Sequence, residues 1–173
     1  MNRRDLFRKA LWGTAAAFSQ GIAPAREFPA DRDASQDLAR ADWKPQFFDA
    51  HQDATLVAFA DVLIPETDTP GAKAALVNRF LDRLLAAETR ENQRDFLSSL
   101  AFLDGEATAR YRAAFVDLTP DRQVDIVTLM AYGEQTHFAR LKDWISRSFY
   151  NSEAGMRTLG YTGVPGGVLP DCK

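Results

Sequence analysis

The sequence contains a single cysteine, Cys172, and only two histidines, His51 and His137, among its 173 residues. One cysteine excludes a Cys-x-x-Cys-His haem attachment site and an iron–sulfur cluster, because both need several cysteine ligands. The sequence also lacks a Gly-x-Gly-x-x-Gly turn between a strand and a helix, and a phosphate-binding loop that ends in Gly-Lys-Ser/Thr. These absences argue against a chain that holds its own redox cofactor.

Neither histidine stands in a sequence pattern that predicts a metal site or a catalytic site. Glu134 and His137 have the spacing of half a di-iron site, but a full site needs a second such pair and two more carboxylates. There is no Gly-x-Ser-x-Gly nucleophile elbow, and neither histidine has a serine or cysteine nearby that would suit base-assisted attack. We expect no catalytic residue and no metal site in this chain, and we interpret Glu134 and His137 as a pair on a helix surface.

Strong charge of one sign is also missing. The chain is 46% hydrophobic and 26% charged, which is usual for a soluble globular protein, and its length suits one domain. The formal net charge is −3, although the first 25 residues contain four basic residues and one acidic residue, so the remainder is more acidic. An acidic body without a basic stripe argues against nucleic acid as a partner.

The first 25 residues resemble a twin-arginine export signal. Arg3 and Arg4 are adjacent and precede a short apolar run, and Ala23 and Ala25 form a small-x-small cleavage site. The run is too short and too rich in alanine to span a membrane, which takes about 20 apolar residues. We predict a signal peptide over 1–25 and a periplasmic protein; the alternative is an uncleaved N-terminal helix or membrane anchor.

Apolar residues recur at spacings of three and four along most of the remaining chain, which predicts helices. No segment alternates apolar and polar residues as a half-buried strand requires. Ser152 and Glu153 are expected to open a short last helix, and five longer helices are predicted over 53–63, 71–88, 92–116, 120–131 and 134–149. The fold prediction is an all-α, single-domain bundle of five or six helices over 53–173, with an extended arm over 26–52 and an irregular C-terminal tail.

Prolines predict where several of these helices begin and end. Pro65 ends the first helix, because proline cannot donate to the helical hydrogen-bond ladder and disfavours the α conformation of the residue before it. Thr69 is expected to cap the second helix with Pro70 in its first position, and Thr119 and Pro120 repeat this arrangement at the fourth helix.

The second helix is predicted to be amphipathic. Its core-facing stripe is expected to contain Ala72, Leu76, Phe80 and Leu84, with Val77, Leu81 and Leu85 beside them. Its solvated side is expected to hold Lys73, Arg79, Asp82 and Arg83.

Two features near the C-terminus are candidates for contact with another subunit. Trp144 and Tyr150 lie off the apolar stripe of the fifth helix, and with Tyr161 they are candidates for a partner interface, because exposed aromatic residues mark such surfaces. Cys172 lies next to last on a tail rich in glycine and proline, without an internal partner. In an oxidising compartment it is a candidate for an intersubunit disulfide, and a free or capped thiol is the alternative.

Two segments of the sequence resemble the gluconate 2-dehydrogenase subunit 3 family. The first is ADVLIPETDTPGAKAALVNRFLDRLL over 60–85, and the second is the tail from Phe149 to Cys172. The resemblance extends over about 53–172 and is specific at both ends. It implies a small subunit that accompanies a flavin-dependent sugar or sugar-acid dehydrogenase.

That resemblance implies that FAD is bound by a large dehydrogenase subunit and haem c by a multihaem cytochrome subunit, with no cofactor in this chain. The small subunit would help the flavoprotein to fold and carry it through the twin-arginine route, and would meet the inner membrane only through its partners. A stand-alone exported helical adaptor or stress protein, without a dehydrogenase, is the alternative. A small enzyme in its own right has the least support.

Overall fold

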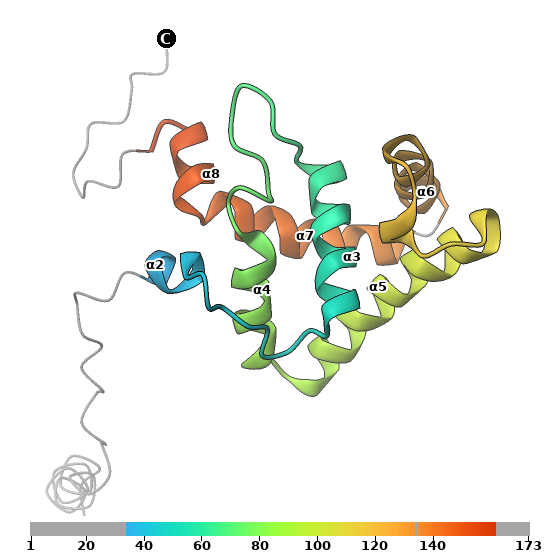
Figure 1. Ribbon diagram of the computed structural model, residues 1–173, viewed down its shortest axis with the longest axis horizontal. Coiled ribbons are helices and arrows are strands. Elements are labelled where there is room, and N and C mark those ends of the chain that lie inside the picture. Colours follow the sequence, from blue (N-terminus) through green and yellow to red (C-terminus); the bar gives the residue numbers. More distant parts are fainter. Residues whose placement is uncertain (1–33, 134, 162–173) are drawn as a thin grey trace, which may run out of the picture. The chain divides into compact units, whose positions relative to one another are not determined.

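The computed structural model describes residues 34–133 and 135–161. The chain divides into two compact units, 1–37 and 38–173, and nearly all of the described residues belong to the second. Within the described ranges there are seven α-helices, one 3₁₀ turn and no strand, which confirms the all-α class (Figure 1). The elements are α2 (Ala34–Ala39), α3 (Ala50–Leu63), α4 (Val77–Ala86), α5 (Arg90–Tyr111), η1 (Phe115–Asp117), α6 (Pro120–Tyr132), α7 (Gln135–Tyr150) and α8 (Glu153–Thr158).

Six of these helices, α3 to α8, correspond to the predicted bundle, and α2 lies in the segment predicted as an arm. α3 begins earlier than predicted because Asp49 caps it. The Asp49 carboxylate accepts a hydrogen bond from the Gln52 N–H (2.8 Å), and the Gln52 side chain accepts one from the Asp49 N–H (3.2 Å). α3 ends at Leu63, shortly before Pro65, as the proline predicts.

The start of α4 differs from the prediction. Thr69 and the proline after it do not open the helix, which begins at Val77. The chain instead makes one helical turn that ends at Leu76, whose backbone is left-handed (φ 54°, ψ 36°). The Val77 N–H donates to the Ala72 carbonyl (3.2 Å) and the Leu76 N–H donates to the Lys73 carbonyl (3.1 Å), the two bonds of a Schellman helix end.

Close packing of the backbone explains this early turn. The Ala72 N–H donates back to the Ile64 carbonyl (2.9 Å), which holds the turn against the end of α3. A Cβ atom on Gly71 would lie 2.6 Å from the Glu66 nitrogen and 2.7 Å from the Ile64 oxygen, so only glycine fits here. Tertiary contact therefore decides the path of the chain and overrides the local Thr-Pro signal.

Of the next two helices, α5 ends earlier than predicted and α6 begins where predicted. α5 ends at Tyr111 rather than at the predicted Val116, because Arg112 is left-handed (φ 59°) and closes the helix. α6 begins at Pro120 after Thr119, as predicted, although the Thr119 side chain makes no capping hydrogen bond.

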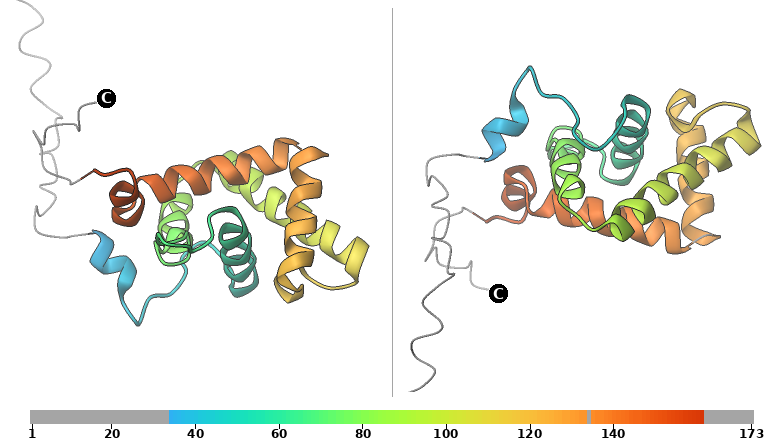
Figure 2. Two further views of the ribbon diagram at one scale, coloured as in Figure 1. Left: turned by 90° about the horizontal axis from the view of Figure 1, so that it is seen from above. Right: turned by 90° about the horizontal axis from the view of Figure 1, so that it is seen from below.

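The helix α7 packs against α4, α5, α6 and α8. It crosses behind α3 and α4 and reaches α6 at its far end (Figures 1 and 2). Its buried side chains include Leu141, Ile145 and Phe149, and Phe138 packs at the edge of the core. Ser152 caps α8 by accepting a hydrogen bond from the Gly155 N–H (3.1 Å), which confirms the predicted start of the last helix.

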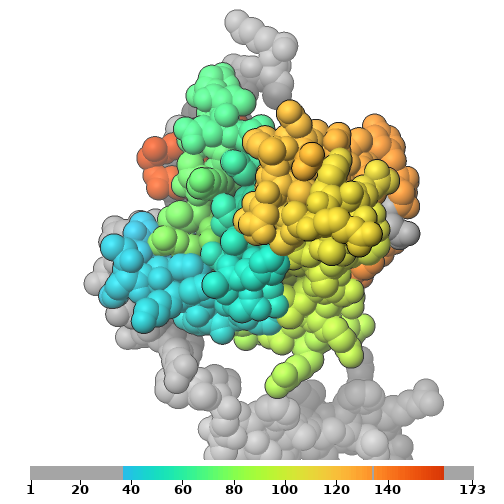
Figure 3. Space-filling view, turned by 45° about the vertical axis from the view of Figure 1, so that its right-hand side comes forward, coloured from blue at the N-terminus to red at the C-terminus, as the bar shows by residue number. Residues whose placement is uncertain are grey.

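On the opposite side of the bundle, α3 is bordered by α5, η1 and α6 (Figure 3). The core, to which α4 and α7 also contribute, is apolar and aromatic. Its largest fully buried side chains are Phe59, Phe96, Phe115, Leu56, Leu81, Leu85, Leu103, Ile126, Met130, Leu141, Ile145 and Val77.

Candidate functional site

A groove of about 350 Å³ lies on the surface between α4 and α7. α4 supplies Phe80 and Leu84, and Glu88 follows at the end of that helix. The α7 side of the groove consists of Asp143, Trp144, Arg147, Ser148 and Asn151. We call this feature the α4–α7 groove.

The apolar part of the α4–α7 groove is backed by the core. Phe80 is 39% exposed, and Leu84 and Trp144 are half-buried. The Trp144 ring packs edge-on against the fully buried Phe96 ring, with 6.3 Å between their centroids. An aromatic side chain that is fixed from within and open to solvent on one side suits contact with another protein.

The charged groups around the groove have partners in the same chain. The Arg147 Nε donates to the Asp143 Oδ1 (2.8 Å), and the Glu88 Oε2 accepts from the Asn92 Nδ2 (2.8 Å). The Asn151 side chain donates to the Arg147 carbonyl (2.8 Å). The groove therefore combines an apolar centre with a polar edge in which Asp143 and Arg147 pair with each other and Glu88 is hydrogen-bonded, the composition of an interface core and its rim.

The three aromatic residues predicted for an interface occupy different places. Trp144 lines the α4–α7 groove. Tyr150 is 48% exposed and packs edge-on against Phe149 (5.3 Å), and Tyr161, the last described residue, is 52% exposed; neither lines the groove. Contact of these residues with a partner stays a prediction.

The sequence did not predict that Phe80 and Leu84 would lie on this surface. Both were expected in the core-facing stripe, and that expectation is wrong for Phe80, which is exposed. The left-handed residue Leu76 separates the turn at 72 from α4, so the four-residue repeat does not form one continuous stripe. The side chains that α4 buries are Val77, Leu81, Asp82 and Leu85.

Asp82 is fully buried, which corrects the prediction that it lies on the solvated side of the helix. Its carboxylate accepts hydrogen bonds from the backbone N–H groups of Gln46 (2.7 Å), Phe47 (2.9 Å) and Phe48 (2.9 Å). These residues belong to the segment 38–49, which we call the strap. A buried carboxylate is stable here because backbone donors replace the water that it loses.

Arg79, one turn before Asp82 on α4, holds the other end of the strap. Its Nη1 donates to the carbonyls of Leu38 (2.6 Å) and Arg40 (3.0 Å), and its guanidinium lies over the Trp43 ring, 4.9 Å from the centroid. Within the strap, the Arg40 guanidinium donates to both carboxylate oxygens of Asp42 and holds the pKa of Asp42 below its ordinary value. Arg79 and Asp82 together form a clamp that fastens the strap to α4.

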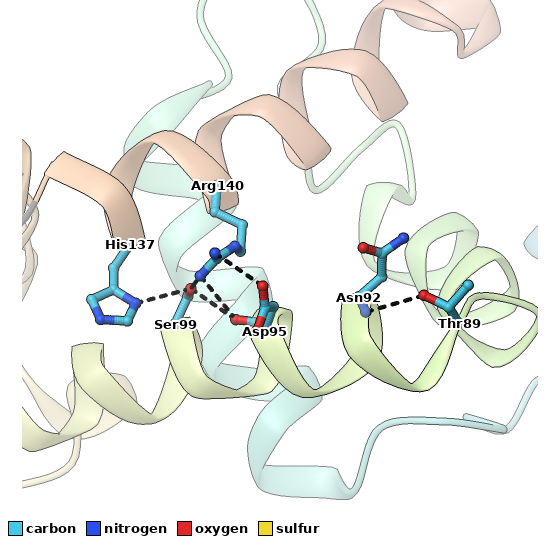
Figure 4. Close-up of polar contacts among 6 residues, drawn as sticks. All are labelled: Thr89, Asn92, Asp95, Ser99, His137 and Arg140. Carbon is cyan, nitrogen blue, oxygen red and sulfur yellow. Dashed lines mark hydrogen bonds and ion pairs between the residues drawn. The ribbon is translucent and has the colours of Figure 1, made fainter.

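A polar cluster lies between α5 and α7 (Figure 4). The Ser99 Oγ lies 3.1 Å from the His137 Nδ1, a proximity that the sequence spacing did not indicate. Ser99 is fully buried; its hydroxyl donates to the Asp95 carbonyl (3.0 Å) and accepts from the Arg140 Nη1 (3.3 Å). Arg140 also forms an ion pair with the Asp95 carboxylate (3.1 Å).

This cluster joins two helices and has no open side at the serine. A fully buried hydroxyl cannot reach a substrate, and this one already makes two further hydrogen bonds. The His137 ring stacks on Phe102, 4.6 Å between centroids, and is half-buried, so His137 is not the surface residue that was expected. Glu134, its expected partner, lies outside the described residues.

His51 takes part in a second connection between helices. Its Nε2 lies 2.7 Å from the Asp104 Oδ2, and the other carboxylate oxygen of Asp104 accepts from the Phe115 N–H (2.9 Å). The side chain of Asp104 on α5 therefore ties α3 to η1. Within 34–133 and 135–161, no group of three or more His, Cys, Asp or Glu side chains is placed to hold a metal ion. None of the helices in these ranges combines the length and apolarity needed to cross a membrane.

Several predicted residues cannot be placed. Arg3, Arg4, Ala23, Ala25 and Cys172 lie outside the described residues. The export signal, its cleavage site and the intersubunit disulfide therefore stay predictions.

Comparison with known proteins identifies the family. The family model described as gluconate 2-dehydrogenase subunit 3 matches residues 50–166, which include all of α3 to α8. Neither a curated protein nor a solved structure gives a significant match. The family match covers more than half of the chain and contains the segment 60–85 and the part of the tail from 149 to 166. The chain belongs to the gluconate 2-dehydrogenase subunit 3 family.

Proposed function

We propose that this chain is the non-catalytic small subunit of a periplasmic, membrane-associated dehydrogenase that oxidises gluconate, another sugar acid, a sugar or a polyol. The family match over 50–166 carries this proposal, because the family is named for the third subunit of such an enzyme. In this proposal a large partner subunit binds FAD and performs the oxidation, and a cytochrome subunit with haem c passes the electrons on.

The roles of the buried and half-buried polar residues support a subunit that contributes surface rather than chemistry. Asp82 binds three backbone N–H groups, Asp104 binds His51 and a backbone N–H, and Ser99 is enclosed between two helices. Each of these groups holds one element against another. Such a network favours a single rigid arrangement of the helices, which a docking surface needs.

A subunit of this kind helps its partner by mass action. A chain that binds the folded flavoprotein and not the unfolded one stabilises the folded form by RT ln(1 + [L]/Kd), about 2.7 kcal/mol when its concentration is 100 times the Kd. This gain shifts the partner toward the folded state in the cytoplasm, where FAD is loaded. The twin-arginine route exports proteins that have already folded, so Arg3 and Arg4 on this chain would serve the bound partner too.

The export step gives a direct test. The chain is co-expressed with a candidate FAD-dependent dehydrogenase subunit from the same genome, and the flavoprotein is measured in periplasmic and cytoplasmic fractions. Changing both Arg3 and Arg4 to Lys is expected to leave the flavoprotein in the cytoplasm. Arg8→Lys, a matched change outside the adjacent pair, is expected to leave export unchanged. Undiminished export of the flavoprotein by the double variant would contradict the proposed escort role.

A further inference from the structure

The strap lies at the edge of the bundle, where two side chains of α4 hold it in place. We infer that the strap opens and closes as one unit, from Leu38 up to Asp49, while α3 to α8 stay folded. The strap is then a latch whose closed state depends on Arg79 and Asp82. The opening itself does not rest on the proposed function, because it concerns this chain alone.

The polar contacts that close the strap go to its backbone. The Asp82 carboxylate accepts the three N–H groups of residues 46–48, and the Arg79 Nη1 donates to the carbonyls of Leu38 and Arg40. When the strap opens, water replaces the lost partner of every one of these groups, and the Asp82 carboxylate leaves a buried position that is unfavourable for a charge. Release of this clamp therefore costs less than the loss of as many contacts inside an apolar core.

Little apolar surface holds the strap to the bundle. Within the strap only Leu38 and Phe48 are buried, Trp43 and Phe47 are half-buried, and the other side chains are exposed. The Phe48 ring lies 5.7 Å from the ring of Phe96 on α5, and opening gives up this contact with the core. Segments with few buried apolar contacts and a solvent-exposed backbone open locally, before the whole fold does.

The opening has a limit at Asp49. This residue caps α3 through its capping box with Gln52 and uses no group of α4 for that purpose, so it stays in place when the clamp releases. The family match begins at residue 50, so the strap lies outside the matched residues, whereas Arg79 and Asp82 lie inside them. The part of the chain that matches the family thus begins where the strap ends.

Arg79 and Asp82 hold opposite ends of the strap but act together. They are three residues apart on α4, so they lie on the same side of one helix. Trp43, between the two ends, lies over the Arg79 guanidinium, 4.9 Å from the ring centroid. When one end is released, the chain between the ends gains freedom and the other end loses its fixed geometry. The two ends are therefore expected to open together.

Opening changes the length of chain that precedes the bundle. With the strap closed, residues 26–37 separate the predicted signal peptide from Leu38, the first residue that the clamp holds. Release of residues 38–48 adds about 35–40 Å of extended chain. The strap therefore sets how far the predicted export signal reaches from the bundle, a consequence that rests on the proposed function.

Native-state hydrogen exchange of the full chain, at low concentrations of urea, measures the opening. The amides of 46–48 are expected to exchange at least about tenfold faster than the core of α5 and with a weaker dependence on urea, because a local opening exposes less surface than global unfolding.

A substitution at the other end of the strap tests whether the two ends are coupled. Arg79 contacts none of the amides of 46–48, so a purely local loss at Arg79 leaves their exchange unchanged. We expect Arg79→Met to accelerate exchange at 46–48 by about tenfold or more and to leave the core of α5 unchanged. Arg83→Met makes the same change at an exposed arginine of α4 and is the control, with an expected change of less than about twofold.

Two results would overturn the inference. Exchange at 46–48 that is as slow as in the core of α5, with the same dependence on urea, would show that the strap opens only when the whole bundle unfolds. Unchanged exchange at 46–48 in Arg79→Met would show that the two ends open separately.

A second variant decides the case in which Arg79→Met accelerates exchange in the strap and in α5 by the same factor. Trp43→Ala changes a side chain of the strap and none of the bundle. Faster exchange at 46–48 alone supports the latch, and equal acceleration in α5 overturns it. None of these measurements uses the flavoprotein, so failure of the latch leaves the proposed function standing, and failure of the export test leaves the latch standing.

Discussion

The buried carboxylate of Asp82 offers the sharpest test of the fold. In Asp82→Asn the side chain keeps its shape, but one acceptor oxygen becomes an NH₂ donor. The native carboxylate receives the Gln46 N–H on one oxygen and the N–H groups of Phe47 and Phe48 on the other. The amide can serve only one of these two sides, so at least one backbone donor loses its acceptor and faces another donor.

The size of the effect follows from these contacts. Losing one hydrogen bond to a charged group costs about 1.5–3 kcal/mol, and the remaining bonds weaken because the acceptor becomes neutral. We expect Asp82→Asn to lower the free energy of unfolding by about 2–4 kcal/mol, out of the 5–15 kcal/mol typical of a domain. The expected fall in Tm is about 10 °C for a domain of this size.

Urea denaturation followed by circular dichroism measures the loss, and amide hydrogen exchange locates it. Exchange at residues 46–48 is expected to accelerate more than exchange in α5, because the strap opens first. Asp61→Asn, an exposed aspartate on α3, is the control and is expected to change stability by less than about 0.5 kcal/mol. A stability of Asp82→Asn within about 0.5 kcal/mol of the native chain, or unchanged protection at 46–48, would refute this reasoning.

Two further pairs of substitutions test the backbone. Gly71→Ala is expected to destabilise the chain by about 1–3 kcal/mol, because the new Cβ meets backbone atoms at 2.6–2.8 Å. Gly105→Ala, with open space around it on α5, is expected to stabilise the chain by about 0.5–1 kcal/mol. The melting temperatures of the two variants should therefore shift in opposite directions. Arg112→Gly is expected to stabilise the chain by about 1 kcal/mol, because Arg112 is exposed and its backbone is left-handed. Arg110→Gly, inside the last turn of α5, is expected to destabilise the chain by about 1 kcal/mol. Urea midpoints that fall for both variants would contradict the left-handed helix end at Arg112.

The all-α class and most helix ends could be predicted from the sequence because local chemistry determines them. Pro65 stops α3, Pro120 opens α6 and Ser152 caps α8, and none of these effects depends on distant parts of the chain. The capping box of Asp49 and Gln52 is equally local. Its Asp-x-x-Gln spacing was available as a signal, and it would have placed the start of α3 correctly.

The polar contacts between elements could not be predicted, because each one joins residues far apart in the chain. Ser99 and His137 are on α5 and α7, and Asp82 binds a segment more than thirty positions earlier. No spacing rule connects such residues before the helices are packed. Asp82 did carry one signal in the sequence: the apolar residues Leu81 and Leu85 stand one position before and three positions after it, which favours the same face of the helix for Asp82.

The departures from simple patterns gather on α4 and the turn before it. Leu76 takes a left-handed backbone that costs roughly 1–2 kcal/mol for a residue other than glycine. Asp82 is buried where a polar residue is expected outside, and Phe80 is exposed where an aromatic residue is expected inside. Departures from local rules are expected where tertiary contacts or a function constrain the sequence. The helix α4 thus fastens the strap through the buried Asp82 and presents the exposed Phe80 to the α4–α7 groove.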